Sequence, residues 1–297
     1  MKDFEYFLPG SLEEALALLS GRRDAKILAG GTDLVVQMKD RRACPAVLID
    51  VKKVPELNRL ASVEDGSLFI GAAVPLNRVI AYPPVWERFH VLFEACSLVG
   101  SLQLRNRGTV GGNICNAAPS ADTAPPLLCL SARAVVARLG GTRVVPVADF
   151  FVGPGKTVLD ESELLVGIEV PRPPTPSAGS YLRHIPRQEM DIAVAGVASF
   201  LSFGQGDTCR EARIALGAVA PTPVRAPGVE SLLEGRPLTE ESIEEAAKEA
   251  SREASPISDI RGSAAYRREI VGVLTKRALE TAWERYRARK RERGSIG

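Results

Sequence analysis

The chain has 297 residues, of which 45% are hydrophobic and 25% are charged, the ordinary range for globular proteins. Its 38 Lys and Arg nearly balance its 36 Asp and Glu, and the net charge of +2 gives no overall attraction toward nucleic acid or membranes. The N-terminus has no signal-peptide pattern, and no apolar run approaches the roughly 18 residues that span a bilayer. We therefore expect a cytoplasmic protein of one large or two to three small domains, with no membrane span.

The cysteines and histidines offer little material for metal binding or nucleophilic catalysis. The five cysteines are widely spaced without any C-x-x-C, which predicts reduced, mostly buried thiols and no zinc or iron–sulfur site on this chain. The two histidines, His90 and His184, are more often structural than catalytic when they occur alone. We assign no catalytic residue and no metal ligand.

The first helix is predicted over residues 11–20, where Ser11 and Glu14 form an S-x-x-E capping box. Residues 26–38 (AKILAGGTDLVVQ) then predict a buried strand, a sharp turn and a helix capped by Thr32 or Asp33. Paired glycines let a ligand approach the backbone, and free N–H groups at a helix start attract phosphate. On the residues alone, this segment is either a phosphate-binding turn or an ordinary strand-turn-helix corner.

A second glycine-rich stretch, residues 106–122 (NRGTVGGNICNAAPSAD), has low propensity for strand or helix and predicts a ligand-binding loop. Two glycine pairs about 80 residues apart favour one extended, phosphate-bearing ligand held between them. The intervening chain predicts, in order, a strand at 47–51, a hairpin of 59–63 and 67–71 around Asp65-Gly66, and two short helices at 75–82 and 85–92 separated by Pro83-Pro84.

The remaining elements alternate hairpins, a proline-rich linker and helices. The sequence GPGKT at residues 153–157 imitates a phosphate-binding P-loop, but Phe150 stands where the motif requires glycine, which excludes an NTPase of that type. The other predictions begin with a hairpin of 134–139 and 142–147, a strand at 163–170 and a linker at 171–179. Strands are expected at 181–187, 193–203 and 211–220, with a turn at 204–207. Helices are expected at 229–233, at 239–251 with the capping pair Thr239 and Ser242, and at 264–291 with Ile270, Val273, Leu274 and Leu279 on one side.

The end of the last predicted helix is basic. Residues 276–293 carry eight basic and three acidic side chains. A nucleic-acid patch is one interpretation, and a solvated helix end whose cations complement the helix dipole is the other. Because the stretch contains no known nucleic-acid-binding motif, we favour the solvated helix end and expect no nucleic-acid partner.

The two glycine motifs, AGGTDL and TVGGN, together resemble the FAD-binding medium subunit of the molybdenum hydroxylases, which includes the flavoproteins of xanthine dehydrogenase and aerobic carbon monoxide dehydrogenase type. Three later stretches are similar to the same family: ELLVGIEVP (163–171), RQEMDIAVAGVA (187–198) and SDIRGSAAYRREIV (258–271). The resemblance extends from Phe7 to about Arg277.

The resemblance implies an α+β fold in two parts. Residues 1–175 would form an FAD-binding domain of the vanillyl-alcohol oxidase (PCMH) type, with lobes at about 1–55 and 56–175. Residues 176–297 would form a C-terminal α+β domain with an antiparallel sheet, of the carbon monoxide dehydrogenase flavoprotein type. FAD would lie between the two lobes.

The resemblance also implies the residues that bind FAD. The first motif would hold the diphosphate through backbone N–H groups, and the second would contact the diphosphate and ribityl chain. Asn116 and Asp122 would bond the ribityl or adenosine hydroxyls, and Leu165 would touch the adenine. Arg183, Arg187 and Asp191 would lie near the flavin edge or the lobe interface. In chain order these residues are Ala29, Gly30, Gly31, Thr32, Asp33, Leu34, Thr109, Gly112, Asn113, Asn116, Asp122, Leu165, Arg183, Arg187, Asp191 and Ile192. Ile192 falls where some relatives carry an aromatic residue over the flavin ring.

The implied function is electron relay. A large subunit with a molybdenum–pterin cofactor would oxidise a substrate, a small subunit would pass the electrons through [2Fe–2S] clusters, and non-covalent FAD on this chain would deliver them to NAD, O₂ or a quinone. The complex would be a dimer of heterotrimers. A poor inventory of acid–base residues fits this role, because the flavin carries the redox chemistry. The alternatives are a self-sufficient FAD-dependent oxidoreductase of the same fold and a non-catalytic scaffold that binds through the basic C-terminal helix.

Overall fold

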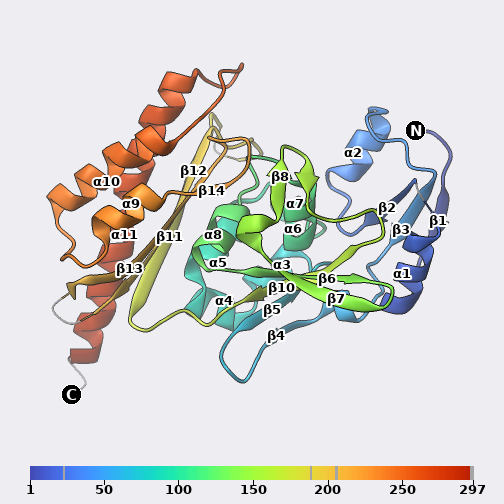
Figure 1. The fold of residues 1–297 in the computed structure, drawn as a ribbon, viewed down its shortest axis with the longest axis horizontal. Helices are drawn as coiled ribbons and strands as arrows, with labels where there is room; N and C mark the ends of the chain where they lie inside the picture. Colours follow the sequence, from blue (N-terminus) through green and yellow to red (C-terminus); the bar gives the residue numbers. More distant parts are fainter. Residues whose placement is uncertain (23, 188, 205–206, 295–297) are drawn as a thin grey trace.

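A computed structural model describes residues 1–22, 24–187, 189–204 and 207–294 (Figure 1). The N-terminal segment forms a small parallel sheet in the order β1-β3-β2, in which Ile27 pairs with Ile49. Helix α1 begins after Ser11, whose side chain accepts a hydrogen bond from the Glu14 amide as its capping box predicts. The elements are β1 (Glu5–Phe7), α1 (Leu12–Ser20), β2 (Ala25–Leu28), α2 (Leu34–Lys39) and β3 (Val47–Asp50).

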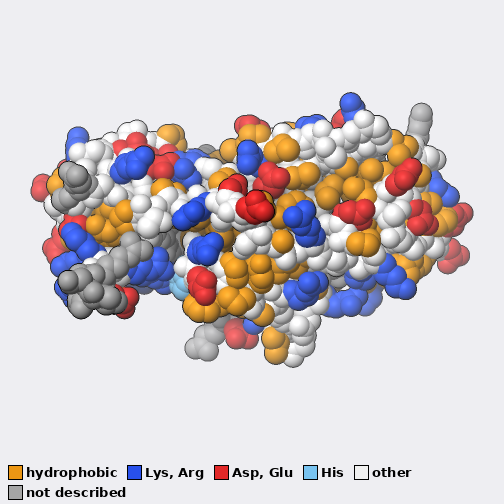
Figure 2. Space-filling view, turned by 90° about the horizontal axis from the view of Figure 1, so that it is seen from below, with side chains coloured by type: hydrophobic (Ala, Val, Ile, Leu, Met, Phe, Trp, Pro, Cys, Tyr) orange, Lys and Arg blue, Asp and Glu red, His pale blue; other side chains and the backbone are white. Residues whose placement is uncertain are grey.

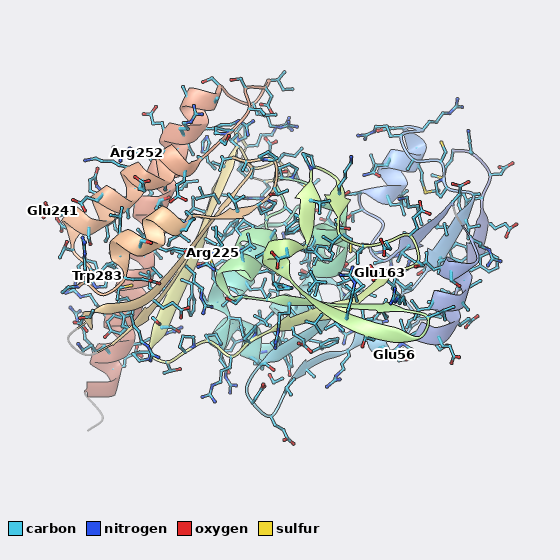
Figure 3. All side chains as sticks on the ribbon, in the orientation of Figure 1. Glu56, Glu163, Arg225, Glu241, Arg252 and Trp283 are labelled. Carbon is cyan, nitrogen blue, oxygen red and sulfur yellow. The ribbon has the colours of Figure 1, made fainter. Side chains whose placement is uncertain are left out.

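A five-stranded antiparallel sheet follows, in the order β4-β5-β10-β6-β7. Both predicted hairpins are confirmed, and Gly66 adopts the positive φ of 83° that the Asp65-Gly66 turn requires. Buried Glu163 precedes β10 and accepts hydrogen bonds from Arg143 on β7, both at 2.7 Å (Figure 3). The strands are β4 (Leu60–Ser62), β5 (Leu68–Gly71), β6 (Arg133–Arg138), β7 (Gly141–Pro146) and β10 (Leu164–Val170), and a separate hairpin pairs β8 (Phe151–Gly153) with β9 (Lys156–Thr157).

The helices between β5 and β6 differ from the predicted ones. Pro83 and Pro84 open a helix instead of separating two, because proline is compatible with the first helical turn, where its missing N–H is not needed. The stretch 106–122, predicted as a loop, contains a helix and leads into another. The helices between β5 and β6 are α3 (Leu76–Ile80), α4 (Pro83–Arg88), α5 (His90–Leu98), α6 (Leu102–Arg105), α7 (Val110–Asn116) and α8 (Ala124–Cys129). Two short 3-10 helices lie outside this stretch, η1 (Glu56–Asn58) before β4 and η2 (Val147–Asp149) after β7.

The C-terminal part is an antiparallel sheet in the order β11-β12-β13-β14, with α9–α11 on one face and α5 and α8 on the other (Figure 1). Strand β11 begins at residue 177, so the proline-rich crossover is shorter than predicted. The predicted turn at 204–207 includes residues 205–206, which lie outside the described residues. The elements are β11 (Ser177–His184), β12 (Ala195–Phe203), β13 (Cys209–Gly217), β14 (Val224–Arg225), α9 (Pro227–Leu233), α10 (Glu240–Glu253) and α11 (Ala264–Gly294).

Helix α11 covers the C-terminal sheet with a stripe of small and aliphatic side chains. Val271, Leu274, Ala278 and Leu279 are buried, whereas Val273, predicted on the apolar side, is 40% exposed. The prediction for Val273 was wrong because it placed the buried face of α11 by its large aliphatic residues alone. Small residues such as Ala278 and Ala282 are also buried, and they define a face that does not include Val273. The buried apolar residues form one core around the N-terminal sheets and a second between the C-terminal sheet and its helices.

The segment 258–271 joins α11 to the ends of two strands. The Arg267 side chain is buried and donates hydrogen bonds to the carbonyl oxygens of Val194 (3.0 Å) and Ala218 (3.1 Å) and to the Asp259 carboxylate (2.6 Å). Each carbonyl lies next to the end of a β-strand, where the ladder no longer supplies a donor. This explains why an arginine stands in the first turn of a helix that packs on a sheet.

The α+β class predicted from the sequence is confirmed. Among the described residues, no helix combines the length and the apolar character that crossing a membrane requires.

Candidate cofactor-binding site

The two glycine-rich segments lie against each other in space. A Cβ atom added to Gly30 would lie 2.3 Å from the Arg107 carbonyl oxygen and 2.8 Å from the Gly108 Cα, so only glycine allows this contact. From the other side, a Cβ on Gly108 would lie 3.7 Å from the Thr32 hydroxyl. The structure therefore joins the start of α2 and the start of α7 into one surface, between the parallel sheet and the five-stranded sheet.

The first segment offers a run of free backbone donors. Within the described part of the chain, the N–H groups of residues 30–34 donate to no protein acceptor, while the Gly31 carbonyl already accepts from Val35. Gly31 has a φ of 74°, which turns the chain sharply between β2 and α2. Consecutive unpaired N–H groups in such a turn form an anion-binding concavity.

The predicted cap of this helix was wrong. Asp33 occupies the N-cap position of α2, but neither its side chain nor that of Thr32 caps the helix. Asp33 has helical backbone angles (φ −94°, ψ −48°) rather than the extended ones of most N-cap residues, and this places its carboxylate away from the helix amides. Desolvation raises the pKa of the Asp33 carboxyl above its usual value.

The second segment is a helix start rather than an open loop. The Thr109 hydroxyl accepts the Gly112 amide at 2.8 Å and caps α7. Gly111 faces the core, where an added Cβ would lie 2.6 Å from the Ala72 Cα, whereas one on Gly112 would meet only the Thr109 hydroxyl, at 3.0 Å. Close packing on one side thus stabilises a helix of low propensity, and the Gly112 side is left open for a ligand.

Two asparagines of α7 bind neighbouring elements. Asn113 Oδ1 accepts the Thr123 hydroxyl at 2.6 Å, and Asn116 Oδ1 accepts the Gln37 amide at 3.3 Å. The second bond links α7 directly to α2. The side-chain oxygens of both asparagines therefore hold the surface together, and their side-chain NH₂ groups can donate to a ligand.

Asp122 and Arg183 form a buried ion pair between the N-terminal and C-terminal sheets. Asp122 accepts from Arg183 at 2.5 Å and from the Tyr181 hydroxyl at 2.8 Å, and the Arg183 side chain is only 5% exposed. Burial raises the pKa of the Asp122 carboxyl, and the Arg183 charge together with the two hydrogen bonds opposes that rise. Asp122 was predicted to bond the ribityl or adenosine hydroxyls, and Arg183 to lie near the flavin edge or the lobe interface. The structure shows that the two side chains contact each other.

The other predicted residues belong to other elements. Leu165 on β10 is a core residue, 3% exposed. Arg187 and Asp191 form an ion pair at 3.6 Å in the connection between β11 and β12, and Ile192 beside them is 47% exposed.

One group at the first segment was missed from the sequence. Lys52 Nζ donates to the Ala29 carbonyl at 3.3 Å and to Asp50 at 2.6 Å, and Tyr6 donates to the same carboxylate at 2.5 Å. Burial acts to raise the pKa of Asp50, but the hydrogen bonds from Lys52 and Tyr6 hold it below its usual value. Lys52 thus places an ammonium group, paired with the Asp50 carboxylate, beside the free N–H groups, and no local motif indicates it.

The Cys115 thiol, which lies on α7 in the second segment, is protonated at neutral pH. Burial raises the pKa of Cys115, and likewise of Cys96 and Cys129, to about 12. A protonated thiol is a poor nucleophile. Among the described residues, no three His, Cys, Asp or Glu side chains are grouped to hold a metal ion.

Comparison with known families covers nearly the whole chain. Residues 2–173 match the family described as "FAD binding domain in molybdopterin dehydrogenase", and residues 180–282 match "CO dehydrogenase flavoprotein C-terminal domain". The chain is 39% identical to the carbon monoxide dehydrogenase medium chain of Hydrogenophaga pseudoflava, over 95% of this chain and 98% of that one. It is 33% identical to the nicotinate dehydrogenase FAD-subunit of Eubacterium barkeri, over 93% and 95% of the two chains.

Solved structures show the same fold. A chain of the Hydrogenophaga pseudoflava carbon monoxide dehydrogenase lacking the Mo-pyranopterin moiety superposes with a TM-score of 0.91 at 38% identity, covering 96% of this chain and 98% of that one. A chain of quinoline 2-oxidoreductase from Pseudomonas putida 86 gives a TM-score of 0.90 at 32% identity, covering 96% and 99%.

Proposed function

Since the chain belongs to the family of FAD-binding medium subunits of the molybdenum hydroxylases, we propose that it carries non-covalent FAD and relays electrons within such a complex. The observation that carries the proposal is the joined surface of α2 and α7. There, the segment whose backbone N–H groups are free of protein acceptors packs against the start of α7, where the Gly112 side is open. A near-neutral chain has no surplus of cations for a diphosphate, and backbone donors supply the charge compensation instead.

Different residues of this surface bind different parts of FAD. The N–H groups of residues 30–34 hold the diphosphate, and Lys52 compensates its charge through the Ala29 end of the turn. Gly112 lets the ligand approach α7 without meeting a side chain, and Asn113 and Asn116 reach the ribityl chain from the same helix. Asp122 and Arg183 position the ligand indirectly, by fixing α8 and β11 next to each other.

FAD supplies the redox chemistry, accepting electrons from one carrier and delivering them to another. This chain binds and orients it. We assign residues 1–175 to the FAD-binding domain, divided at about residue 56, and residues 176–297 to the C-terminal domain. Leu165 is the residue proposed to contact the adenine. Arg187, Asp191 and Ile192 lie on an exposed connection, which suits contact with the flavin edge or with the electron acceptor.

We propose that the partners are a small [2Fe–2S] subunit and a large molybdenum–pterin subunit, because the relatives are carbon monoxide dehydrogenase medium chains, a name that implies a smaller and a larger companion chain. We propose a dimer of heterotrimers, with NAD, O₂ or a quinone as acceptor. The direct test is to reconstitute the purified chain with FAD and then add the subunits encoded with it. One FAD per chain and its reduction by the substrate-reduced complex are expected, and no flavin retention under gentle conditions would contradict the proposal.

Gly112→Val is expected to lower the flavin content below about a tenth of the wild-type value, because the added methyl groups project into the open side of α7. The new Cβ also crowds the Thr109 hydroxyl, so loss of about 1 kcal/mol of stability is expected from the weakened cap. Absorbance at the flavin bands and thermal melting measure the two effects. Gly141→Val is the control, since an added Cβ there meets nothing within 4 Å. Normal flavin content in a folded Gly112→Val chain would remove α7 from the site.

Lys52→Met is expected to weaken FAD binding by about three- to tenfold, the effect of losing one charge-assisted interaction at a partly exposed position. Titration of the apoprotein followed by flavin fluorescence gives the Kd, and its dependence on salt should also decrease. Lys53→Met removes the same charge from the exposed neighbouring position and should leave the Kd unchanged. Equal Kd values for both variants would show that Lys52 has no role in binding.

A further inference from the structure

A second surface of the molecule has the features of a binding site. A groove of about 610 Å³ opens between the β4–β5 turn, α4, the crossover before β11 and the end of α11. None of its lining residues belongs to the two glycine-rich segments. Figure 2 views the molecule from the side of this turn, and Lys and Arg side chains gather at the left of that face, over the end of α11. A volume of this size is typical of small-molecule sites.

Three arginines from separate parts of the chain line this groove. Arg88 ends α4, Arg172 lies in the crossover, and Arg289 lies near the end of α11. Arg88 and Arg172 have no hydrogen bond or ion pair with any described residue, and the one bond of Arg289 is a long one, 3.4 Å, to the Ser177 carbonyl. None of these three arginines lies within ion-pair distance of a carboxylate among the described residues, although Glu64 and Glu87 also line the groove. Lys290, by contrast, is paired with Asp207 at 2.5 Å.

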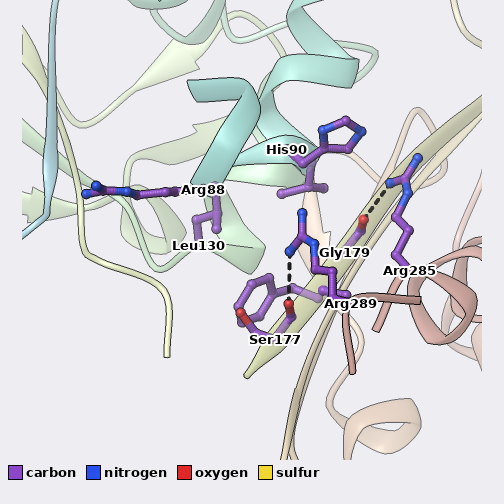
Figure 4. A pocket seen from close by; sticks show the side chains of 10 residues that line it. Arg88, His90, Leu130, Ser177, Gly179, Arg285 and Arg289 are labelled. Carbon is purple, nitrogen blue, oxygen red and sulfur yellow. Dashed lines mark hydrogen bonds between the residues drawn. The ribbon is translucent and has the colours of Figure 1, made fainter. Parts of the chain in front are cut away.

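The backbone around these arginines is held in place. The Arg172 stem lies over Gly66, where an added Cβ would be 2.7 Å from its Cδ. A small pocket of about 20 Å³ adjoins the groove and shares Arg88 and Arg289 with it (Figure 4). Beside it Arg285 donates to the Gly179 carbonyl at 2.7 Å and to Glu94, which fixes α11 on β11. The elements that carry the arginines are thus fixed, and a ligand needs to order only the arginine side chains when it binds.

We propose that this groove binds a phosphorylated small molecule of nucleotide or sugar-phosphate size, separately from FAD. Guanidinium groups recognise phosphate through paired, charge-assisted hydrogen bonds. Glu64 and Glu87 line the same groove and are exposed, and their carboxylates suit the hydroxyl groups of a sugar. The arginines of the groove come from three separate parts of the chain, and most basic side chains of α11 do not line it, which separates this site from a general nucleic-acid surface along that helix.

The test uses the full chain purified with its bound flavin, titrated calorimetrically with ADP and with inorganic pyrophosphate at physiological ionic strength. ADP is expected to bind with one site per chain and a Kd below about 1 mM, without releasing flavin. Arg172→Ala and Arg289→Ala should each weaken binding by about tenfold or more. Pyrophosphate should bind more weakly than ADP, because it lacks the hydroxyl groups.

Arg287→Ala is the matched control, since it removes the same charge from α11 at a residue that packs over Trp283 and does not line the groove. It should bind ADP as the wild type does, and melting curves check that all variants are folded. Three results would overturn the proposal: no ADP binding, an equal loss in Arg287→Ala, or release of flavin in proportion to the ADP bound. The last would place ADP in the FAD site. None of these results depends on whether the chain relays electrons.

Discussion

Gly30→Ala is expected to give a folded chain that no longer retains FAD. The new Cβ would lie 2.3 Å from the Arg107 carbonyl oxygen and 2.8 Å from the Gly108 Cα, both of them backbone atoms that no rotamer change can move. To restore ordinary contact, the α2 turn and the α7 turn must separate by about 1 Å. Such overpacking costs about 1–3 kcal/mol of folding free energy, and it also changes the spacing between the two sets of groups that hold one ligand.

The effect on binding should exceed the effect on stability. Backbone donors bind a diphosphate only when they converge on it, and we expect a Kd for FAD at least about 100-fold higher, equivalent to roughly 2.7 kcal/mol. Flavin-to-protein absorbance after gel filtration and fluorescence titration of the apoprotein measure this loss. Gly141→Ala, at a position with free space around it, is the control and should bind normally. Should Gly30→Ala fail to fold, Gly108→Ala introduces a milder steric conflict. Its Cβ would lie 3.3 Å from the nearest atom, the Leu104 carbonyl oxygen. Full flavin content in both variants would refute the two-segment site.

The features predicted correctly from the sequence are those with local causes. The Asp65-Gly66 hairpin, the Ser11 cap and the Thr239–Ser242 capping box depend on residues within four positions of one another, and the structure contains all three. The pairing of the two glycine motifs was predicted from their likeness to each other and to a family. What brings them together is the contact of Gly30 with Arg107, which no local pattern contains.

The features that were missed have distant causes. Helix α7 contains two glycines and has low propensity, and it forms because Gly111 packs on Ala72, in a different part of the chain. Lys52 is one of two adjacent lysines, and only the course of β2 and β3 shows which one reaches the Ala29 carbonyl. Asp122 and Arg183 are 61 residues apart. Their ion pair depends on how α8 packs on the C-terminal sheet, which a single sequence does not reveal.

Arg183→Met is expected to lower the free energy of unfolding by about 3–5 kcal/mol at neutral pH, because it leaves the Asp122 carboxylate buried without its counter-charge. The double variant Asp122→Asn, Arg183→Met removes both charges and keeps an acceptor for the Tyr181 hydroxyl. Its loss should be clearly smaller than the sum of the two single losses. Urea unfolding of the wild type and the three variants gives the coupling energy directly. Additive losses would show that the pair does not act as a unit.

The loss of folding stability in Arg183→Met should also depend on pH, and the pKa of Asp122 sets the direction of this dependence. Burial already raises the pKa of this carboxyl, and removing Arg183 removes the charge that opposes the rise, so its folded-state pKa rises further. The folded variant then binds a proton at pH values where the unfolded chain, with an ordinary Asp pKa of about 3.9, does not. Stability of the variant relative to the wild type must therefore increase as the pH falls from 8 toward 5. Arg267→Met serves as the comparison, because its partner Asp259 is partly exposed and has a pKa below its usual value, so no such recovery is expected there. A deficit in Arg183→Met that stays constant with pH would mean that Asp122 remains ionised without its partner, and that water reaches this junction.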